Sequence, residues 1–73
     1  MDKKTFMGKT YKEYIEIGIT AELEAIAFYN FLISIEKNGN VQRSWIHIRD
    51  EEKDHLKILR KKISQLHHRV VIK

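Results

Sequence analysis

The chain has no cysteine and no proline, and only three of its 73 residues are glycine. Without cysteine it can form neither a disulfide nor a thiolate-bound zinc or iron–sulfur site. The scarcity of turn-forming residues argues against a fold of many short strands. The length allows one domain, residues 1–73, and a domain this small has a marginal core unless a metal or oligomerisation stabilises it.

Long apolar runs are also missing. The longest, residues 25–29 and 31–33, are separated by Asn30 and fall far short of the roughly 20 residues that cross a bilayer. The first residues contain no apolar region of the signal-peptide kind. We therefore predict a cytoplasmic protein with no membrane partner. The formal net charge of +4 permits contact with nucleic acid but does not require it.

The sequence does contain two long segments of helix-forming residues, at about 10–37 and 41–69. Apolar residues recur in each at steps of three and four, the period of an amphipathic helix. Between the two segments we expect Gly39 to take the left-handed conformation after the first helix and Asn40 to cap the second. Lys37 is expected in the last turn of the first helix, where a cation favours the helix dipole.

A connection of so few residues makes the two helices antiparallel. The sequence therefore predicts an all-α fold, an antiparallel two-helix hairpin. Aromatic and branched residues beside the main apolar stripes widen the apolar face of this hairpin. We expect such a hairpin to pair with a second copy of itself into a four-helix bundle.

Three polar residues interrupt the apolar stripes: Glu22 in the first segment, and Glu52 and His55 in the second. A buried carboxylate costs several kcal/mol unless it is neutralised or paired. A chain that reverses near residues 38–40 places position i opposite about position 78 − i, so Glu22 lies level with Glu52 and His55. Each residue alone is more readily a long side chain that bends out to solvent, but their convergence predicts a metal site.

Di-metal carboxylate bundles use a Glu from each of two helices and a Glu-x-x-His from each of the other two. This chain has one helix of each kind, so a twofold dimer would complete the set at its interface. Oxygen and imidazole donors suit Fe, Mn, Co or Zn. Tyr29, seven residues after Glu22, lies on the same helix face. Its hydroxyl either hydrogen-bonds a ligand carboxylate or belongs to an ordinary core tyrosine.

The residues around this trio resemble a known family. Glu22-Leu-Glu-Ala25-Ile-Ala-Phe-Tyr29 is similar to the Glu-x-x-Ala-x-x-x-Tyr helix of ferritin-like and rubrerythrin-like proteins. Arg49-Asp-Glu-Glu52-Lys-Asp-His55 is similar to their Glu-x-x-His helix. A single hairpin of this kind most resembles the encapsulated ferritins, half-ferritins that build a four-helix ferroxidase unit from two chains.

The resemblance implies that Glu22, Glu52 and His55 are ferroxidase ligands that hold two Fe per dimer. It places Tyr29 close to the iron pair and Glu24 in an outer metal-attracting site. The implied activity is that of an oxidoreductase, which uses O₂ or peroxide to oxidise Fe²⁺ to Fe³⁺ for iron storage or detoxification. The resemblance also implies rings of dimers, commonly decamers, housed in a cytoplasmic encapsulin shell.

Other interpretations of the same residues stay open. One is a basic helical-hairpin dimer that binds RNA or a protein, with the polar layer setting only the register. The basic run at residues 57–62 complements a helix dipole more readily than it forms a nucleic-acid patch, because no aromatic residues interleave with it. A rubrerythrin-like peroxidase is a further interpretation, although the chain has no Cys-rich electron-transfer domain.

Overall fold

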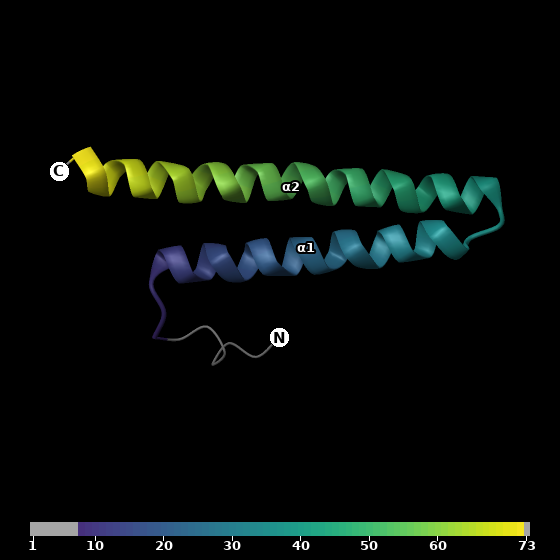
Figure 1. Cartoon of the computed structure of the whole chain (residues 1–73), viewed down its shortest axis with the longest axis horizontal. Coiled ribbons are helices and arrows are strands. Elements are labelled where there is room, and N and C mark those ends of the chain that lie inside the picture. Colours follow the sequence, from purple (N-terminus) through teal and green to yellow (C-terminus); the bar gives the residue numbers. More distant parts are fainter. Residues whose placement is uncertain (1–7, 73) are drawn as a thin grey trace.

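The computed structural model describes the backbone of residues 8–72 and the side chains of residues 8–66. This part of the chain forms two α-helices, α1 (Tyr11–Ile35) and α2 (Gly39–Ile72), and no strand. The helices lie side by side and antiparallel, joined by residues 36–38 (Figure 1). The predicted all-α hairpin is confirmed, and α2 continues three residues beyond its predicted end at residue 69.

The start of α1 is fixed by a capping box. The hydroxyl of Thr10 accepts a hydrogen bond from the backbone N–H of Glu13 at 3.2 Å, and the Glu13 carboxylate accepts one from the backbone N–H of Thr10 at 2.9 Å. Two donors that a helix start leaves unpaired are thereby satisfied. The bond from the Thr10 backbone, more than any other contact, holds the pKa of Glu13 below its usual value. The predicted start near residue 10 is therefore confirmed.

The turn between the helices differs from the prediction at its caps. The Oδ1 atom of Asn38 accepts hydrogen bonds from the backbone N–H groups of Asn40 at 2.9 Å and Val41 at 3.2 Å. Asn38 is therefore the residue that caps α2, and the assignment of this role to Asn40 was wrong. Gly39 is the first residue of α2. The only positive φ of a glycine in residues 8–72 belongs to Gly8, so the left-handed Gly39 was also wrong.

The end of α1 shows why no left-handed glycine is needed. The chain leaves α1 through an extended Glu36, with φ −78° and ψ 122°. The side-chain amide of Gln42 donates to the carbonyl oxygen of Ile33 at 2.9 Å, one of the acceptors that a helix end leaves unpaired. Because α1 stops at Ile35, Lys37 lies in the turn between the helices. The prediction that Lys37 lies in the last turn of α1 was wrong.

Contacts across the seam confirm the predicted register. Gly18 of α1 lies directly against Leu59 of α2, so that a Cβ at Gly18 would be 3.3 Å from the Leu59 Cδ1 atom. Nearer the turn, the rings of Tyr29 and Trp45 stack with centroids 6.2 Å apart. The first pair falls within one residue, and the second within one helical turn, of the expected match of position i with position 78 − i. The level of every residue in the seam is therefore set by the position of the turn.

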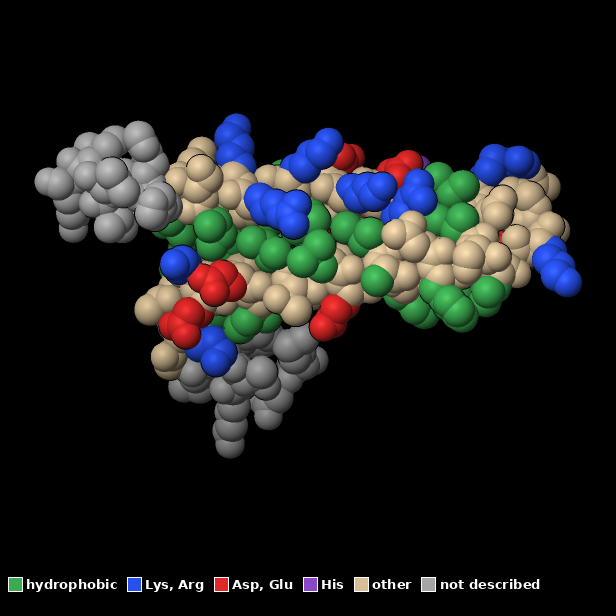
Figure 2. All heavy atoms as spheres, in the orientation of Figure 1, with side chains coloured by type: hydrophobic (Ala, Val, Ile, Leu, Met, Phe, Trp, Pro, Cys, Tyr) green, Lys and Arg blue, Asp and Glu red, His purple; other side chains and the backbone are tan. Residues whose placement is uncertain are grey.

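The hairpin has almost no core of its own. Among the described side chains, only Ile15 and Leu56 are buried hydrophobic residues, each 7% exposed. The thinnest dimension of the molecule is 13 Å, about the diameter of one helix with its side chains. Hydrophobic side chains lie open on its surface, several of them on the outer side of α1 near the turn (Figure 2). The large exposed ones are Tyr11, Leu23, Phe28, Phe31, Ile35, Val41 and Ile58.

By length and composition alone, α1 could cross a membrane. The mean hydropathy of an 18-residue window within it is 1.3. The sequence-based expectation considered only uninterrupted apolar runs and overlooked this property. Glu22 and Glu24 lie near the middle of α1, where a charged side chain in hydrocarbon is costly. A helix that is apolar on most sides also suits the interior of a bundle.

The cap assignment yields a direct test. Asn38→Ala removes the acceptor for two backbone N–H groups, so we expect it to lower the free energy of unfolding by about 1 kcal/mol. Asn40→Ala is the matched control, because the Asn40 side chain accepts a hydrogen bond only from Arg43, one turn further along. Urea unfolding at fixed protein concentration measures both variants. A larger loss in Asn40→Ala than in Asn38→Ala would contradict the assignment.

Candidate metal centre

The predicted trio converges in the middle of the seam. Glu22 comes from α1, and Glu52 and His55, three residues apart, lie on one face of α2. The His55 Nδ1 atom is 3.8 Å from Oε2 of Glu22 and 3.7 Å from Oε2 of Glu52. One donor atom from each residue lies within 4.8 Å of the other two. No other convergent group of three or more His, Asp or Glu side chains occurs in the described part of the chain.

Burial divides the trio into an inner and an outer part. The side chains of Glu22 and Glu52 are 21% and 22% exposed, whereas that of His55 is 53% exposed. The Oε2 atom of Glu22 is buried and has no hydrogen-bond partner. An unsatisfied buried oxygen is costly, and a cation is one partner that would satisfy it. The open side of the site is the side on which His55 lies.

The Glu52 carboxyl perturbs that of Glu22. A hydrogen bond with Glu52 is the largest of the effects that raise the pKa of Glu22, followed by burial and by the negative charge of Glu52. His55 acts in the opposite direction but does not outweigh them. The protonated form of Glu22 is therefore more favourable than that of an isolated glutamate. A divalent metal ion bound between the carboxylates would compete with protons for Glu22.

The donor set fits a first-row divalent metal. Two donors on opposite sides of one ion are about 4.2 Å apart, and the donor atoms of the trio, which lie within 4.8 Å of one another, come close to that separation. Carboxylate and imidazole donors suit iron, manganese, cobalt and zinc. Three donors leave at least one position open even on a tetrahedral ion. The single chain therefore provides a metal site that is incomplete.

Tyr29 lies one layer closer to the turn than the trio. Its ring stacks on Trp45 and meets Phe28 edge-on, with centroids 5.3 Å apart. Within residues 8–66 no hydrogen bond joins the Tyr29 hydroxyl to Glu22 or Glu52. In this chain Tyr29 forms part of an aromatic layer beside the site, the arrangement of a core tyrosine, which was one of the two interpretations.

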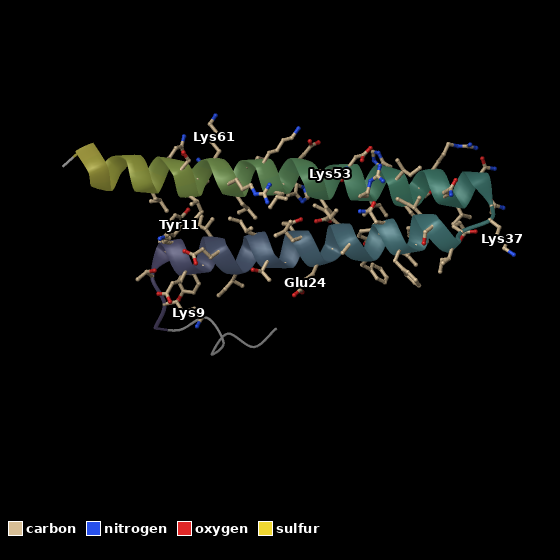
Figure 3. The ribbon with its side chains drawn as sticks, in the orientation of Figure 1. Lys9, Tyr11, Glu24, Lys37, Lys53 and Lys61 are labelled. Atoms are coloured by element: carbon tan, nitrogen blue, oxygen red, sulfur yellow. The ribbon has the colours of Figure 1, made fainter. Side chains whose placement is uncertain are left out.

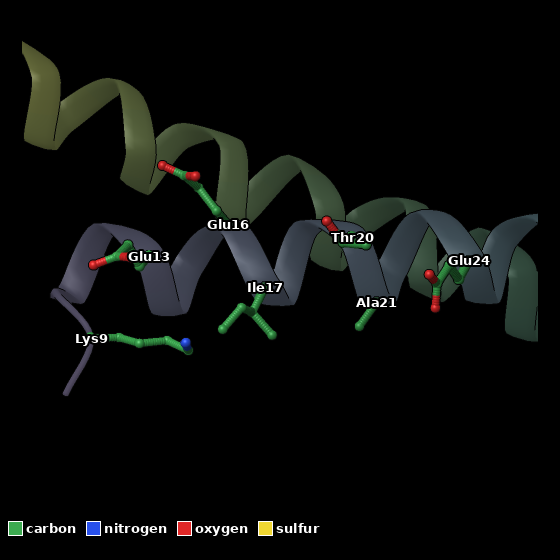
Figure 4. A pocket seen from close by; sticks show the side chains of 7 residues that line it. All are labelled: Lys9, Glu13, Glu16, Ile17, Thr20, Ala21 and Glu24. Atoms are coloured by element: carbon green, nitrogen blue, oxygen red, sulfur yellow. The ribbon is translucent and has the colours of Figure 1, made fainter. Parts of the chain in front are cut away.

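Glu24 lies on the other side of α1 from the trio. It points away from α2 (Figure 3), as expected for a residue about 200° around the helix from Glu22. Glu24 lines a shallow groove on the outer face of α1 (Figure 4); the other lining residues are Lys9, Glu13, Glu16, Ile17, Thr20 and Ala21. Two of these carboxylates are already engaged, Glu13 in the capping box and Glu16 with Lys12 at 3.7 Å. The groove does not extend the metal site within one chain.

Arg49 is a residue near the site that the sequence interpretation did not single out. Its Nη1 atom donates to Oδ1 of Asn30 at 3.1 Å, which links α2 to α1 one turn from Glu52. The guanidinium also contacts the Asp50 carboxylate at 3.2 Å. Asn30 interrupts the apolar run of α1, and its predicted partner level is close to residue 49. The interruption of the apolar run at Asn30 was the sequence feature from which this contact between Arg49 and Asn30 could have been predicted.

The raised pKa of Glu22 gives a prediction for the metal-free protein. Because the folded pKa lies above the ordinary 4.5, the contribution of Glu22 to stability is present below pH 4.5 and lost as the pH rises through the raised pKa. Glutamine cannot ionise, so Glu22→Gln should raise the free energy of unfolding at neutral pH, with a smaller gain in acid. Urea unfolding with a chelator at both pH values measures this difference.

Glu24→Gln is the control for that experiment, because Glu24 is exposed and lies outside the seam. It should give no comparable gain at neutral pH. If Glu22→Gln were no more stable than the parent at neutral pH, the two carboxyl groups would not crowd each other in the folded chain.

No protein-family model, curated protein or solved structure gives a significant match to this chain. The interpretation of the site therefore rests on the geometry of Glu22, Glu52 and His55 and on the chemistry of their donor atoms. The likeness to encapsulated ferritins stays a prediction made from the residues of the two helices.

Proposed function

We propose that two copies of this hairpin hold a pair of Fe²⁺ ions between them and oxidise the iron to Fe³⁺, as a ferroxidase of the di-iron carboxylate type. The observation that carries the proposal is the convergence of Glu22, Glu52 and His55 at one level of the seam. It is supported by the unpaired oxygen of Glu22, which a cation would satisfy. One chain provides half of the ligand set of a di-metal bundle.

The second copy docks on the side of the hairpin where His55 is exposed. Gly18 touches Leu59, which is one turn after His55 on α2, so Gly18 lies on that same side. Ala25 follows Gly18 at seven residues and shares its side of α1. Small residues there allow a helix of the second copy to approach the metal ligands closely.

Pairing completes the site and the core together. The two copies bring four carboxylates and two imidazoles to one layer, and the four negative charges balance two divalent ions. The half-buried side chains of Ile48 and Leu59 lie near His55 in helical phase and become covered at the same interface. Water is thereby excluded from a layer that the hairpin alone leaves open.

Each side chain has a defined task in the proposed reaction. Glu22 and Glu52 bind and neutralise the substrate Fe²⁺, and His55 adds a neutral nitrogen donor. Because the pKa of Glu22 is raised, protons compete with the metal for its carboxylate. Bound iron supplies the electrons, so that two Fe²⁺ and two protons convert one O₂ into hydrogen peroxide. The aromatic layer of Tyr29 and Trp45 closes the turn side of the site against water.

A pair of hairpins has no interior large enough to hold an iron mineral. The Fe³⁺ produced must therefore pass to another compartment for storage or detoxification. A ring of dimers inside an encapsulin shell, as the family resemblance implies, belongs to the same proposal.

Replacing one ligand tests the site. Glu52→Ala removes one carboxylate per chain, so we expect paired-metal binding to be lost and Fe²⁺ oxidation to fall by more than about tenfold. Glu51→Ala is the matched control: Glu51 is next in sequence but pairs with His47 at 2.6 Å, outside the site. Metal analysis after desalting and the absorbance rise on adding Fe²⁺ in air measure the two effects. A Glu52→Ala variant that oxidises Fe²⁺ as fast as the parent would refute the assignment.

The same preparations separate the ferroxidase from the binding-module interpretation. The ferroxidase takes up one iron per chain, whereas a hairpin whose polar layer sets only the register takes up none. No metal uptake together with salt-sensitive RNA binding would overturn the proposed function.

A further inference from the structure

The flank of the hairpin opposite the metal side has a row of basic side chains along α2. Four basic residues follow one another at steps of four, four and three, which places them in one stripe: Arg49, Lys53, Lys57 and Arg60. We call these four side chains the α2 basic stripe. Lys53 and Lys57 each stand two residues from His55, about 200° around the helix. A copy that completes the metal site on the His55 side therefore leaves the stripe open.

The stripe is exposed, and the chain itself does not neutralise it. On the face that Figure 2 displays, Lys and Arg side chains lie in a row over α2, with hydrophobic side chains beside them toward α1. Lys53, Lys57 and Arg60 are exposed, and among the side chains of residues 8–66 no carboxylate forms an ion pair with them. Arg49 does have such a partner, the Asp50 carboxylate at 3.2 Å. Three neighbouring cations are therefore open to an anion from outside the chain.

The place of the stripe within α2 removes the explanation that the sequence suggested for the basic run at residues 57–62. Cations complement a helix dipole only near the last turn. Because α2 continues to Ile72, even Arg60 lies twelve residues before its end. Like charges at i and i+4, such as Lys53 and Lys57, also lower the stability of a helix. Within the free hairpin the stripe is therefore unfavourable, and an anionic partner would offset that cost.

We propose that the α2 basic stripe binds linear inorganic polyphosphate, a flexible chain of negatively charged phosphate groups. Neighbouring cations of the stripe are about 5 to 6 Å apart along the helix axis, and the whole stripe extends about 16 Å. A narrow, flexible chain can lie along such a row and bring phosphate oxygens to each cation in turn. Hydrogen bonds between ionised donors and phosphate are among the strongest that side chains form. The stripe shares no residue with the metal trio, so this inference does not depend on the proposed ferroxidase.

The surroundings of the stripe fit other polyanions less well. Single-stranded nucleic acid is bound by cations together with aromatic side chains on which its bases stack. Neither the stripe nor Ile19 and Leu23, which border it on α1, is aromatic. Duplex nucleic acid is stiff, so few of its phosphates would meet a straight row of cations. An acidic protein or a membrane needs an apolar area to cover, and Leu23, 44% exposed, is the one large exposed hydrophobic residue on this flank among the described side chains.

Calorimetric titration of the full chain with long-chain polyphosphate tests the proposal. The parent should bind, and its affinity should fall as salt rises, because binding releases counterions. A stripe variant replaces the three open cations by neutral side chains: Lys53→Gln, Lys57→Gln and Arg60→Gln. It should bind at least about tenfold more weakly, and its salt slope should be smaller by about 0.7 for each cation removed. A parent that does not bind polyphosphate would overturn the proposal.

A control variant loses the same number of charges at the two ends of the hairpin: Lys9→Gln, Lys37→Gln and Arg43→Gln. It should bind polyphosphate nearly as tightly as the parent, because these residues lie outside the stripe. Equal losses in the two variants would show that only the net charge matters, and would overturn the assignment to the stripe. Urea unfolding at low ionic strength should find the stripe variant at least as stable as the parent, since like charges have been removed.

Three further readouts separate this inference from its alternatives. Per phosphate, the parent should bind polyphosphate at least about tenfold more tightly than duplex DNA or vesicles of anionic phospholipid. The reverse order would identify nucleic acid or a membrane as the partner and overturn the proposal. The stripe variant keeps the metal trio and should take up as much iron per chain as the parent. A parent that binds polyphosphate but no iron would refute the proposed function and leave this inference intact.

Discussion

Two helices share only one seam, and a single seam buries only one side of each helix. α1 is apolar on more than one side, so most of its hydrophobic surface stays outside the seam. Ile15 and Leu56 are the buried hydrophobic side chains among those described, which is far less than a domain needs to fold on its own. The exposure of Phe28 and Phe31 and the exposed side of the candidate metal site, where His55 lies, both follow from this deficit.

The candidate metal centre lies in the middle of the seam, where the lack of apolar contacts is most costly. Apolar residues in the middle of the seam would stabilise the hairpin by themselves, but Glu22, Glu52 and His55 stand there instead. Burial and the neighbouring Glu52 raise the pKa of Glu22, and one of its oxygens has no partner. In the proposed function this cost is offset, because a cation between the carboxylates would satisfy the unpaired oxygen and a second chain would cover His55. The proposal therefore couples stability to metal binding.

The proposed pairing uses one side of the hairpin. That side bears His55 and the small residues Gly18 and Ala25, and the proposed function assigns to it the contact that completes the metal site. Arg49 and Asn30 are joined on the opposite flank, away from that contact. Phe28, Phe31 and Ile35 are exposed on the outer side of α1.

The sequence alone determined the two helices, their antiparallel order and the level at which Glu22 meets Glu52 and His55. These follow from the helical period and from the position of the turn, and both are local properties of the chain. The caps at the turn were decided only by the folded chain, because Asn38 and Gln42 satisfy backbone groups that no single-residue preference identifies. The folded chain also decided that Glu24 and Phe31 lie outside the seam. α1 is apolar on several sides, and only its contact with α2 defines which side is the inner one.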